Sequence, residues 1–169
     1  MQKIRILGID PGSYNLGVGC IEKTGTQLKM IFCDVLQAPK TMPFFERLKV
    51  IQAGMKQVLE NTQPHCIAIE DIFYSKSIQS AFQLGTARGM AIGQCLERGL
   101  PLFPYAPTQI KKTVTGFGRA EKEQVLKMVQ LTLGTRLDCK TFDASDALAI
   151  AICHAFAQGS YNFVERLKT

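Results

Sequence analysis

Apolar residues form three short runs near the start of the chain, each with the length and composition of a β-strand. The first covers residues 3–9 and is broken by Asp10-Pro11-Gly12-Ser13, and the second covers residues 16–22. A turn follows at residues 23–26, and a third strand is expected over residues 28–36. Apolar runs bounded by turn residues are typical of buried strands. Because their connections are short, the three strands are predicted to be antiparallel neighbours.

Beyond Pro39, the spacing of the apolar residues changes to three or four positions, which predicts a helix. Phe44, Leu48 and Ile51 would share one face of this amphipathic helix, which ends near Pro64. A strand is then expected over residues 65–69. The remaining expected elements are helices over residues 75–98, 108–114, 120–133 and 142–157, a strand over residues 100–105, and a short basic tail.

This order of elements predicts an α/β fold, with a mixed five-stranded sheet and helices packed on it. A strand that returns after a helix usually lies parallel to an earlier strand, so the strands over residues 3–9 and 65–69 are expected to be parallel neighbours. Asp10 and Glu70 then lie at or near the carboxyl ends of these strands. Open α/β sheets bind their ligands at this edge, so a site is expected there.

The composition agrees with one soluble globular domain over residues 1–169. The chain is 46% hydrophobic and 20% charged, and its six cysteines are scattered without a C-x-x-C pair. Reduced thiols in the cytoplasm are therefore expected, rather than disulfides or a zinc site. Neither a signal peptide nor a membrane span of ~20 apolar residues is expected. The net charge of +6 is compatible with a polyanionic partner but does not identify one.

Carboxylates are the candidate chemical groups. Asp10 ends a strand predicted to be buried, so its charge needs a partner, either a metal ion or its own backbone in an Asp-Pro-Gly turn. Asp143 and Asp146 lie three positions apart at the start of an apolar helix, where capping would explain a single acid. With Glu70 they make four acids that could converge, and such a group repels itself unless divalent cations are present. Two Mg²⁺ or Mn²⁺ ions among oxygen ligands form the clamp used in phosphodiester hydrolysis.

Asp71 is a fifth acid, directly after Glu70. Neighbouring residues of a strand face opposite ways, so the side chain of Asp71 is expected to point away from the metal site.

Three segments resemble the RuvC family of bacterial Holliday-junction resolvases. They are residues 8–13 (Gly-Ile-Asp-Pro-Gly-Ser), 68–70 (Ala-Ile-Glu) and 143–151 (Asp-Ala-Ser-Asp-Ala-Leu-Ala-Ile-Ala), and the similarity runs in the same order over nearly the whole chain. The resemblance implies a ribonuclease-H-like fold with helices on both faces of the sheet. It also implies a structure-selective endodeoxyribonuclease that resolves Holliday junctions by paired symmetric nicks, with a metal-activated water attacking the phosphodiester.

The same resemblance gives roles to particular residues. The catalytic and metal-binding acids would be Asp10, Glu70, Asp143 and Asp146. Lys111 and Lys122 would contact the DNA backbone, and Phe73 would stack on bases at the junction, although it could also be a core residue. Arg119 belongs to the same basic stretch, which reads either as a phosphate-binding surface or as a solvated helix face. Two Mg²⁺ ions per subunit are expected, with Mn²⁺ as an alternative.

The resemblance also implies partners. The family works as a homodimer on a four-way DNA junction, together with the branch-migration proteins RuvA and RuvB. Gly85, Gly89 and Gly93 follow one another at four-residue steps, so they line one face of the helix expected over residues 75–98. Each of these glycines costs a helix ~1 kcal/mol relative to alanine. Close approach of another backbone would explain why glycine is present despite this cost. That backbone belongs either to the chain's own sheet or to the same helix of a second copy.

Three other functions are compatible with the sequence to different degrees. A related ribonuclease-H-like enzyme could act on RNA instead of a DNA junction. An actin-like phosphotransferase also begins with an Asp-x-Gly turn after its first strand, but this chain has no second phosphate loop and no room for a second domain. A non-catalytic junction-binding protein would not need four intact acids.

Overall fold

The computed structural model describes residues 2–12, 14–71, 77–137 and 142–166, and for residues 158–166 it describes the backbone alone. Within these ranges the strands are β1 (Lys3–Asp10), β2 (Asn15–Thr24), β3 (Gln27–Gln37), β4 (Cys66–Glu70) and β5 (Leu102–Tyr105). The helices are α1 (Phe44–Thr62), α2 (Ile78–Glu97), α3 (Pro107–Thr115), α4 (Lys122–Leu133) and α5 (Asp143–Arg166). None of the helices in the described part of the chain is long and apolar enough to cross a lipid bilayer.

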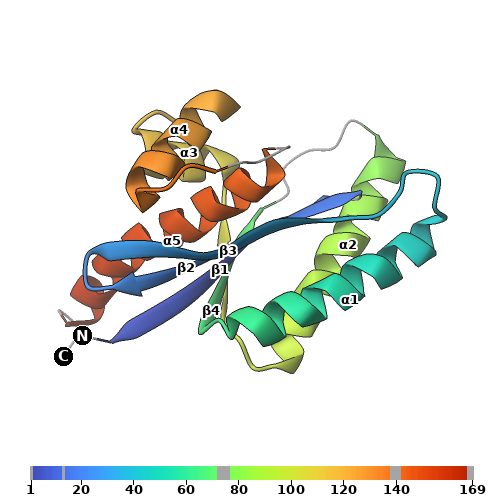
Figure 1. The fold of residues 1–169 in the computed structure, drawn as a ribbon, viewed down its shortest axis with the longest axis horizontal. Helices are drawn as coiled ribbons and strands as arrows, with labels where there is room; N and C mark the ends of the chain where they lie inside the picture. Colours follow the sequence, from blue (N-terminus) through green and yellow to red (C-terminus); the bar gives the residue numbers. More distant parts are fainter. Residues whose placement is uncertain (1, 13, 72–76, 138–141, 167–169) are drawn as a thin grey trace.

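The strands form one sheet in the order β3-β2-β1-β4-β5 (Figure 1). Neighbours are antiparallel in the β1–β2 and β2–β3 pairs and parallel in the β1–β4 and β4–β5 pairs. In the β1–β4 pair, Ile6 lies beside Cys66 and Ile9 beside Ile69, so both strands end at the same edge of the sheet. The expected mixed five-stranded sheet and its parallel central pair are confirmed.

Helices cover both faces of this sheet. In Figure 1, α1 and α2 lie below the sheet, whereas α5 lies above it with α3 and α4 stacked beyond. Successive side chains of a strand point to opposite faces. Accordingly, Leu7 and Ile9 of β1 belong to the apolar core under α1 and α2, and Ile6 belongs to the core under α3, α4 and α5. Asp10 has the same parity as Ile6, so it faces α5.

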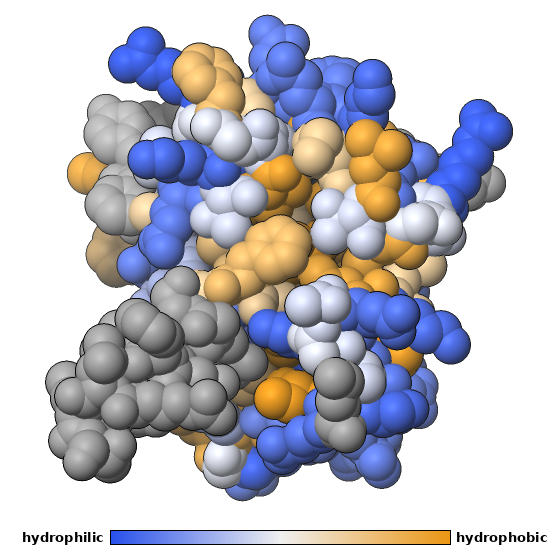
Figure 2. All heavy atoms as spheres, turned by 90° about the vertical axis from the view of Figure 1, so that its left-hand side faces the viewer, coloured by the Kyte–Doolittle hydropathy of each residue, from blue (hydrophilic) through white to orange (hydrophobic). Residues whose placement is uncertain are grey.

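The core under α5 reaches one side of the molecule. Figure 2 views the protein from the left-hand side of Figure 1, where the turn between β2 and β3 lies. Apolar side chains show in the middle of this face and hydrophilic ones surround them. Leu28, Met30 and Leu133 are among the partly buried residues packed against this core. The polar rim limits the apolar surface that meets water.

Two glycines allow α5 to lie directly against the sheet. A Cβ atom on Gly8 would be 1.9 Å from the carbonyl oxygen of Ala147, and one on Gly17 would be 2.2 Å from the carbonyl oxygen of Asp143. No side chain fits at such distances. The start of α5 is therefore fixed against the ends of β1 and β2, which brings Asp143 close to the end of β1.

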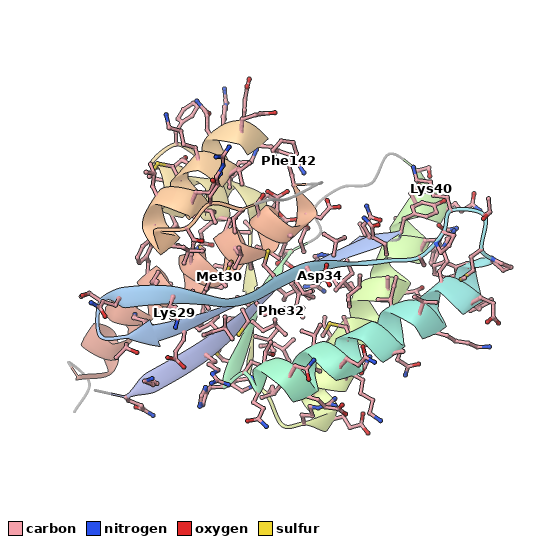
Figure 3. The ribbon with its side chains drawn as sticks, viewed as in Figure 1. Lys29, Met30, Phe32, Asp34, Lys40 and Phe142 are labelled. Atoms are coloured by element: carbon pink, nitrogen blue, oxygen red, sulfur yellow. The ribbon has the colours of Figure 1, made fainter. Side chains whose placement is uncertain are left out.

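An extra residue in β3 reverses the facing of its side chains. Met30 pairs with Ile21, whereas Phe32 pairs with Cys20, so Ile31 has no opposite residue and forms a β-bulge. As a result, Met30 packs into the core under α5 and Phe32 into the core under α1, although both have even numbers. Figure 3 shows the two side chains on opposite sides of the strand. The sequence pattern did not predict this bulge.

The expected order of helices is confirmed, but the end of the last one is wrong. α5 continues through Arg166 instead of ending at Ala157 before a basic tail. Residues 158–166 contain one glycine and no proline. A single glycine costs a helix ~1 kcal/mol, which does not end a long helix on its own. The start of α2 is fixed by Ser77, whose Oγ accepts a hydrogen bond from the Ser80 amide at 3.1 Å.

The glycine stripe of α2 does not pack on the chain's own sheet. A Cβ atom on Gly85, Gly89 or Gly93 would meet no described atom within 4 Å. The buried residues of α2 are Ala87, Ala91, Gln94 and Cys95, on a different face. Of the two explanations that the sequence offered for this stripe, the sheet contact is therefore wrong.

Candidate active site

Two acids meet at the carboxyl ends of the two central parallel strands. Asp10 ends β1 and Glu70 ends β4, each one residue after the paired Ile9 and Ile69. Alternation along the strands turns both carboxylates toward α5, on the face of Gly8 and Ala68. The two side chains are close enough to affect each other's titration: interaction with Asp10 lowers the pKa of Glu70, against the rise that burial causes.

Asp143 and Asp146 join them from the first turn of α5. Gly17, which pairs with Asp10 across β1 and β2, is the point of contact, because a Cβ atom there would lie 2.2 Å from the Asp143 backbone and 3.2 Å from the Cβ of Asp10. The turn is anchored by the amide of Asp146, which donates to the Phe142 carbonyl at 2.8 Å. The spacing of three residues thus places both acids at the same end of the helix.

A cavity of about 160 Å³ lies between these elements. Three of the four acids line it, together with two lysines and apolar residues of α3, α4 and α5. Its lining residues are Asp10, Glu70, Pro107, Ile110, Lys111, Lys122, Val125, Asp146, Ala149 and Ile150. Carboxylates and ammonium groups therefore share one small space with an apolar floor.

The carboxylates affect each other's charge strongly. Burial, together with the charges of Glu70, Asp146 and Asp143, raises the pKa of Asp10 to about 8, while Lys122 opposes the rise. Burial and the charge of Asp146 also raise the pKa of Glu70. The charges of all three other acids therefore act on Asp10, although Asp143 does not line the cavity itself. An uncompensated group of this kind holds a proton near neutral pH.

Lys122 is the cation that offsets this charge. Its Nζ donates to Asp146 Oδ2 at 2.8 Å. Burial works against the charged form of Lys122, but the hydrogen bond to Asp146 and the charges of Asp146, Asp10 and Asp143 raise the pKa of the amine. An ammonium thus lies where the negative charge is concentrated, beside Lys111, whose charge lowers the pKa of Glu70.

The donor set fits a hard divalent cation. All four candidate ligands are carboxylates, and oxygen ligands suit Mg²⁺ or Mn²⁺ rather than zinc. No group of three or more His, Cys, Asp and Glu side chains in the described part of the chain is already arranged to hold a metal ion. The four carboxylates thus supply the charge and the ligand type for such an ion, without already surrounding one point.

Asp71 points away from this site, as expected. Its Oδ1 accepts a hydrogen bond from Arg88 Nη2 of α2 at 3.0 Å, on the opposite face of the sheet. The same arginine donates from Nε to the Glu70 carbonyl at 3.4 Å. Arg88 thus binds the end of β4 from the α2 face of the sheet. The sequence did not indicate this contact.

The remaining predicted residues are placed as follows. Arg119 is exposed between α3 and α4, in the same connection as Phe117, which is 60% exposed. Phe73 lies outside the described residues. His154 is a core residue, with its Nδ1 2.6 Å from the Tyr105 hydroxyl and its Nε2 3.4 Å from Cys66 Sγ. It has no part in the acidic site.

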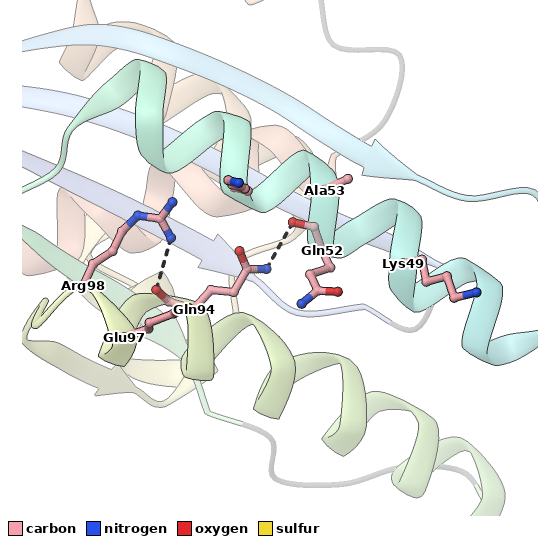
Figure 4. A pocket seen from close by; sticks show the side chains of 7 residues that line it. Lys49, Gln52, Ala53, Gln94, Glu97 and Arg98 are labelled. Carbon is pink, nitrogen blue, oxygen red and sulfur yellow. Dashed lines mark hydrogen bonds between the residues drawn. The ribbon is translucent and has the colours of Figure 1, made fainter.

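A larger hollow lies elsewhere and lacks this chemistry. It measures about 560 Å³, lies between α1 and α2, and is lined by Lys49, Gln52, Ala53, Lys56, Gln94, Glu97 and Arg98. Figure 4 shows Gln94 bonded to the backbone of Gln52 and Arg98 bonded to the backbone of Gln94. Among the described residues, Glu97 is the one carboxylate that lines it. Size therefore does not identify the active site; the converging acids do.

Comparison with known protein families shows which family this chain belongs to. The family model described as "Crossover junction endodeoxyribonuclease RuvC" matches residues 6–154, which includes all four acids. The chain belongs to the RuvC family. RuvC of Chloroflexus aggregans is 41% identical over 153 residues, which cover 90% of this chain and 93% of that protein. RuvC of Desulfitobacterium hafniense is 39% identical over 162 residues, with 96% of both chains covered.

Solved structures agree with this RuvC assignment. The structure of T. thermophilus RuvC in complex with Holliday junction substrate has a TM-score of 0.84 and 33% sequence identity, and covers 92% of this chain and 94% of that one. The yeast mitochondrial Holliday junction resolvase Ydc2, at 16% identity and a TM-score of 0.66, shares the fold alone. The expected ribonuclease-H-like fold and the family resemblance are confirmed, and the actin-like phosphotransferase is set aside.

Sequence reasoning missed one further contact of the site. Asn15, the first residue of β2, donates from Nδ2 to Asp143 Oδ2 at 3.1 Å. The two residues lie far apart in the sequence, and nothing around Asn15 distinguishes it from an ordinary turn residue. Only the close approach of α5 to β2 at Gly17 brings them together.

Proposed function

We propose that this chain resolves Holliday junctions as a structure-selective endodeoxyribonuclease, making paired symmetric nicks, and that the acidic cavity is its active site. The observation that carries the proposal is the convergence of buried carboxylates from the ends of β1 and β4 and the start of α5, which raises the pKa of Asp10 to about 8. Such a concentration of buried acids is unfavourable for folding, so it indicates function. The family's description and the junction complex of T. thermophilus RuvC supply the reaction and the substrate.

Asp10, Glu70, Asp143 and Asp146 are proposed to hold the metal, with two Mg²⁺ ions per subunit and Mn²⁺ as a substitute. When bound, such ions activate water for attack on a phosphodiester and stabilise the leaving oxygen. Asp10, on which the charges of all three other acids act, would be one of the ligands of this site. Lys111 and Lys122 line the same cavity and attract the negatively charged phosphate.

A labelled four-way junction and its linear duplex, each with Mg²⁺ or a chelator, test this function. The wild-type protein is expected to nick the junction symmetrically with Mg²⁺, and to leave the duplex intact. Asp10→Asn is expected to reduce nicking by at least ~10³-fold while junction affinity stays within a few-fold, because the phosphate contacts remain. Loss of binding together with nicking would show that Asp10 is a structural residue instead.

Asp71 provides a matched control for the acids. Glu70→Gln is expected to abolish nicking, whereas Asp71→Asn, one residue along the strand, should retain it because Asp71 faces α2. Equal losses in both variants would contradict the assignment of Glu70. Competition between the junction and an RNA duplex in the same assay separates the enzyme from a nuclease acting on RNA.

The DNA contacts are proposed to come from the basic α3–α4 region and from Phe73. Lys111, Lys122 and Arg119 are assigned to phosphates, so neutralising one of them should weaken junction binding and reduce its salt dependence by about one unit of slope. Phe73 is assigned to base stacking. Phe73→Ala should therefore lower nicking of the junction without changing the salt dependence; an unchanged nicking rate would remove this role.

A homodimer is proposed through α2. Ile78 and Phe82 are 78% and 73% exposed, and they line an apolar hollow of about 460 Å³ with Ala81, Gly85 and Thr86. The open glycine positions beside it would allow a second helix to approach closely. Two symmetric sites are what a four-way junction requires, because two strands must be cut together.

RuvA and RuvB are proposed as partners from family membership alone. Co-sedimentation of this chain with RuvA- and RuvB-bound junction DNA tests the assignment, and sedimentation no greater than with the junction alone would reject it.

A further inference from the structure

Asp143 and Asp146 are held by donors of different kinds. Asp146 accepts from the ammonium of Lys122, a cation, whereas Asp143 accepts from the side-chain amide of Asn15, a neutral group. The amide bonds Oδ2 of Asp143 at 3.1 Å. Oδ1 of the same carboxylate forms no hydrogen bond with a described residue. One oxygen is therefore fixed and the other is left for another partner.

We propose that Asn15 is a positioning residue that sets the metal affinity of the site by fixing the Asp143 carboxylate. This inference rests on the proposed function, since it assumes that Asp143 is a metal ligand. Carboxylates that bind metals are commonly held by hydrogen bonds from a surrounding layer of residues, and loss of such a bond costs 10–100-fold in metal affinity or activity.

A neutral donor suits this task better than a charged one. A lysine at this position would supply positive charge that competes with the metal for Asp143, as Lys122 does for Asp146. An amide fixes the rotamer of the carboxylate without removing its charge. The conformational freedom that Asp143 would lose on binding a cation is therefore already lost in the folded protein.

The position of Asn15 is itself supported by a buried cation. Tyr14, the preceding residue, lies under the guanidinium of Arg47 at 4.2 Å from Cζ to the ring centroid, and its carbonyl accepts from the Ala38 amide at 3.2 Å. Arg47 is only 4% exposed, and no carboxylate among the described residues forms an ion pair with it.

The polar contacts of Arg47 are long and few. Its Nη1 donates to the Met42 carbonyl at 3.4 Å and its Nη2 to Gln83 Oε1 at 3.5 Å, while Nε has no described partner. The ring of Phe44 lies 5.5 Å from Cζ. The stack on Tyr14 is thus the closer of the two ring contacts of this buried guanidinium. It fixes the backbone that leads into Asn15 against α1 and α2.

Direct metal binding tests the proposal. Mn²⁺ affinity of the free protein, measured by titration calorimetry, is expected to fall ~10–100-fold in Asn15→Ala and Asn15→Leu, which lack the donor. The Mg²⁺ concentration for half-maximal nicking should rise by a similar factor, and the rate at saturating Mg²⁺ should recover to within a few-fold of wild type. Junction affinity in chelator should not change.

The stack is tested separately. Arg47→Lys keeps the charge but loses the planar stack, and it is expected to weaken Mn²⁺ binding by about 2–5-fold. Gln37→Ala is the matched control, because Gln37 is the exposed pairing partner of Asn15 on β3. Its Mn²⁺ affinity should equal that of wild type.

Several results would overturn the role of Asn15. Mn²⁺ affinity within about twofold of wild type in both Asn15 variants would do so, as would a nicking rate that high Mg²⁺ does not restore in folded protein. Thermal melts identify a variant that fails to fold, in which case the other Asn15 variant decides. A wild-type protein that neither binds Mn²⁺ nor nicks the junction would instead reject the proposed function.

Discussion

The surroundings of Asp10 suit a carboxylate bound to a cation better than a free carboxylate. Its ordinary pKa of 3.8 rises to about 8 through burial and three neighbouring carboxylates. In the folded, metal-free protein this side chain therefore keeps its proton over most of the neutral range, whereas the unfolded chain releases it. A divalent cation displaces that proton and removes the repulsion.

The raised pKa of Asp10 predicts a pH dependence of stability. Because the folded state binds the proton more tightly, the stabilisation is fully present below about pH 3.8 and is lost as the pH rises through about 8. In chelator, the melting temperature of wild type is expected to fall between about pH 6 and pH 9 more than that of Asp10→Asn. The variant should be more stable at the upper end, by ~0.5–2 kcal/mol.

Addition of Mg²⁺ provides the control for this experiment. It should raise the melting temperature of wild type more at about pH 9 than at about pH 6, and should have little effect on Asp10→Asn. Parallel pH curves for the two proteins in chelator would contradict the raised pKa of Asp10.

At the level of elements, α5 and the strand ends are in contact because β1 and β2 present glycine where the helix crosses them. The sequence predicts both the strands and the helix from their apolar patterns, but not their distance. Gly8 lies under Ala147, and Gly17 lies under Asp143. Any side chain at either position would push the helix outward and move two of the acids away from Asp10.

Substitution of these glycines measures the contact. Gly8→Ala is expected to destabilise the fold by at least ~1–3 kcal/mol, because its Cβ would lie 1.9 Å from a carbonyl oxygen. Gly89→Ala is the control, since its Cβ would meet no described atom within 4 Å and should add up to ~1 kcal/mol of helix stability to the monomer. Urea denaturation of both variants provides the free energies; equal changes would contradict the close packing of α5.

The bulge in β3 is a second feature that depends on how two elements pair. Alternation along residues 28–36 predicts one set of inward-facing side chains, but Ile31 interrupts it and reverses the order. The pattern of apolar residues cannot show this, because β3 packs apolar side chains on both of its faces. The pairing with Cys20 and Ile21 decides which face each residue meets.

For the molecule as a whole, the exposed apolar face of α2 predicts association. Phe82→Glu is expected to convert the protein to a monomer in sedimentation experiments and to reduce paired nicking of the junction, because a charge would be buried between two helices. Phe45→Glu is the matched control: Phe45 is also 73% exposed but lies on α1. Loss of the dimer in both variants, or in neither, would remove α2 as the interface.

The sequence by itself determined the order of the elements, through local periodicity, and the parallel central strands, because a strand that returns after a helix usually pairs in parallel. It also indicated the candidate acids, through their positions at the ends of strands and at the start of a helix. Asp143 and Asp146 are three residues apart, so any helix beginning there presents them together. Tertiary structure alone decided that the α2 glycines face outward and that Asn15 bonds Asp143. Both depend on how closely separate elements pack. The distance between two elements is set by residues that are remote in the sequence: α5 approaches β1 and β2 closely because Gly8 and Gly17 have no side chain.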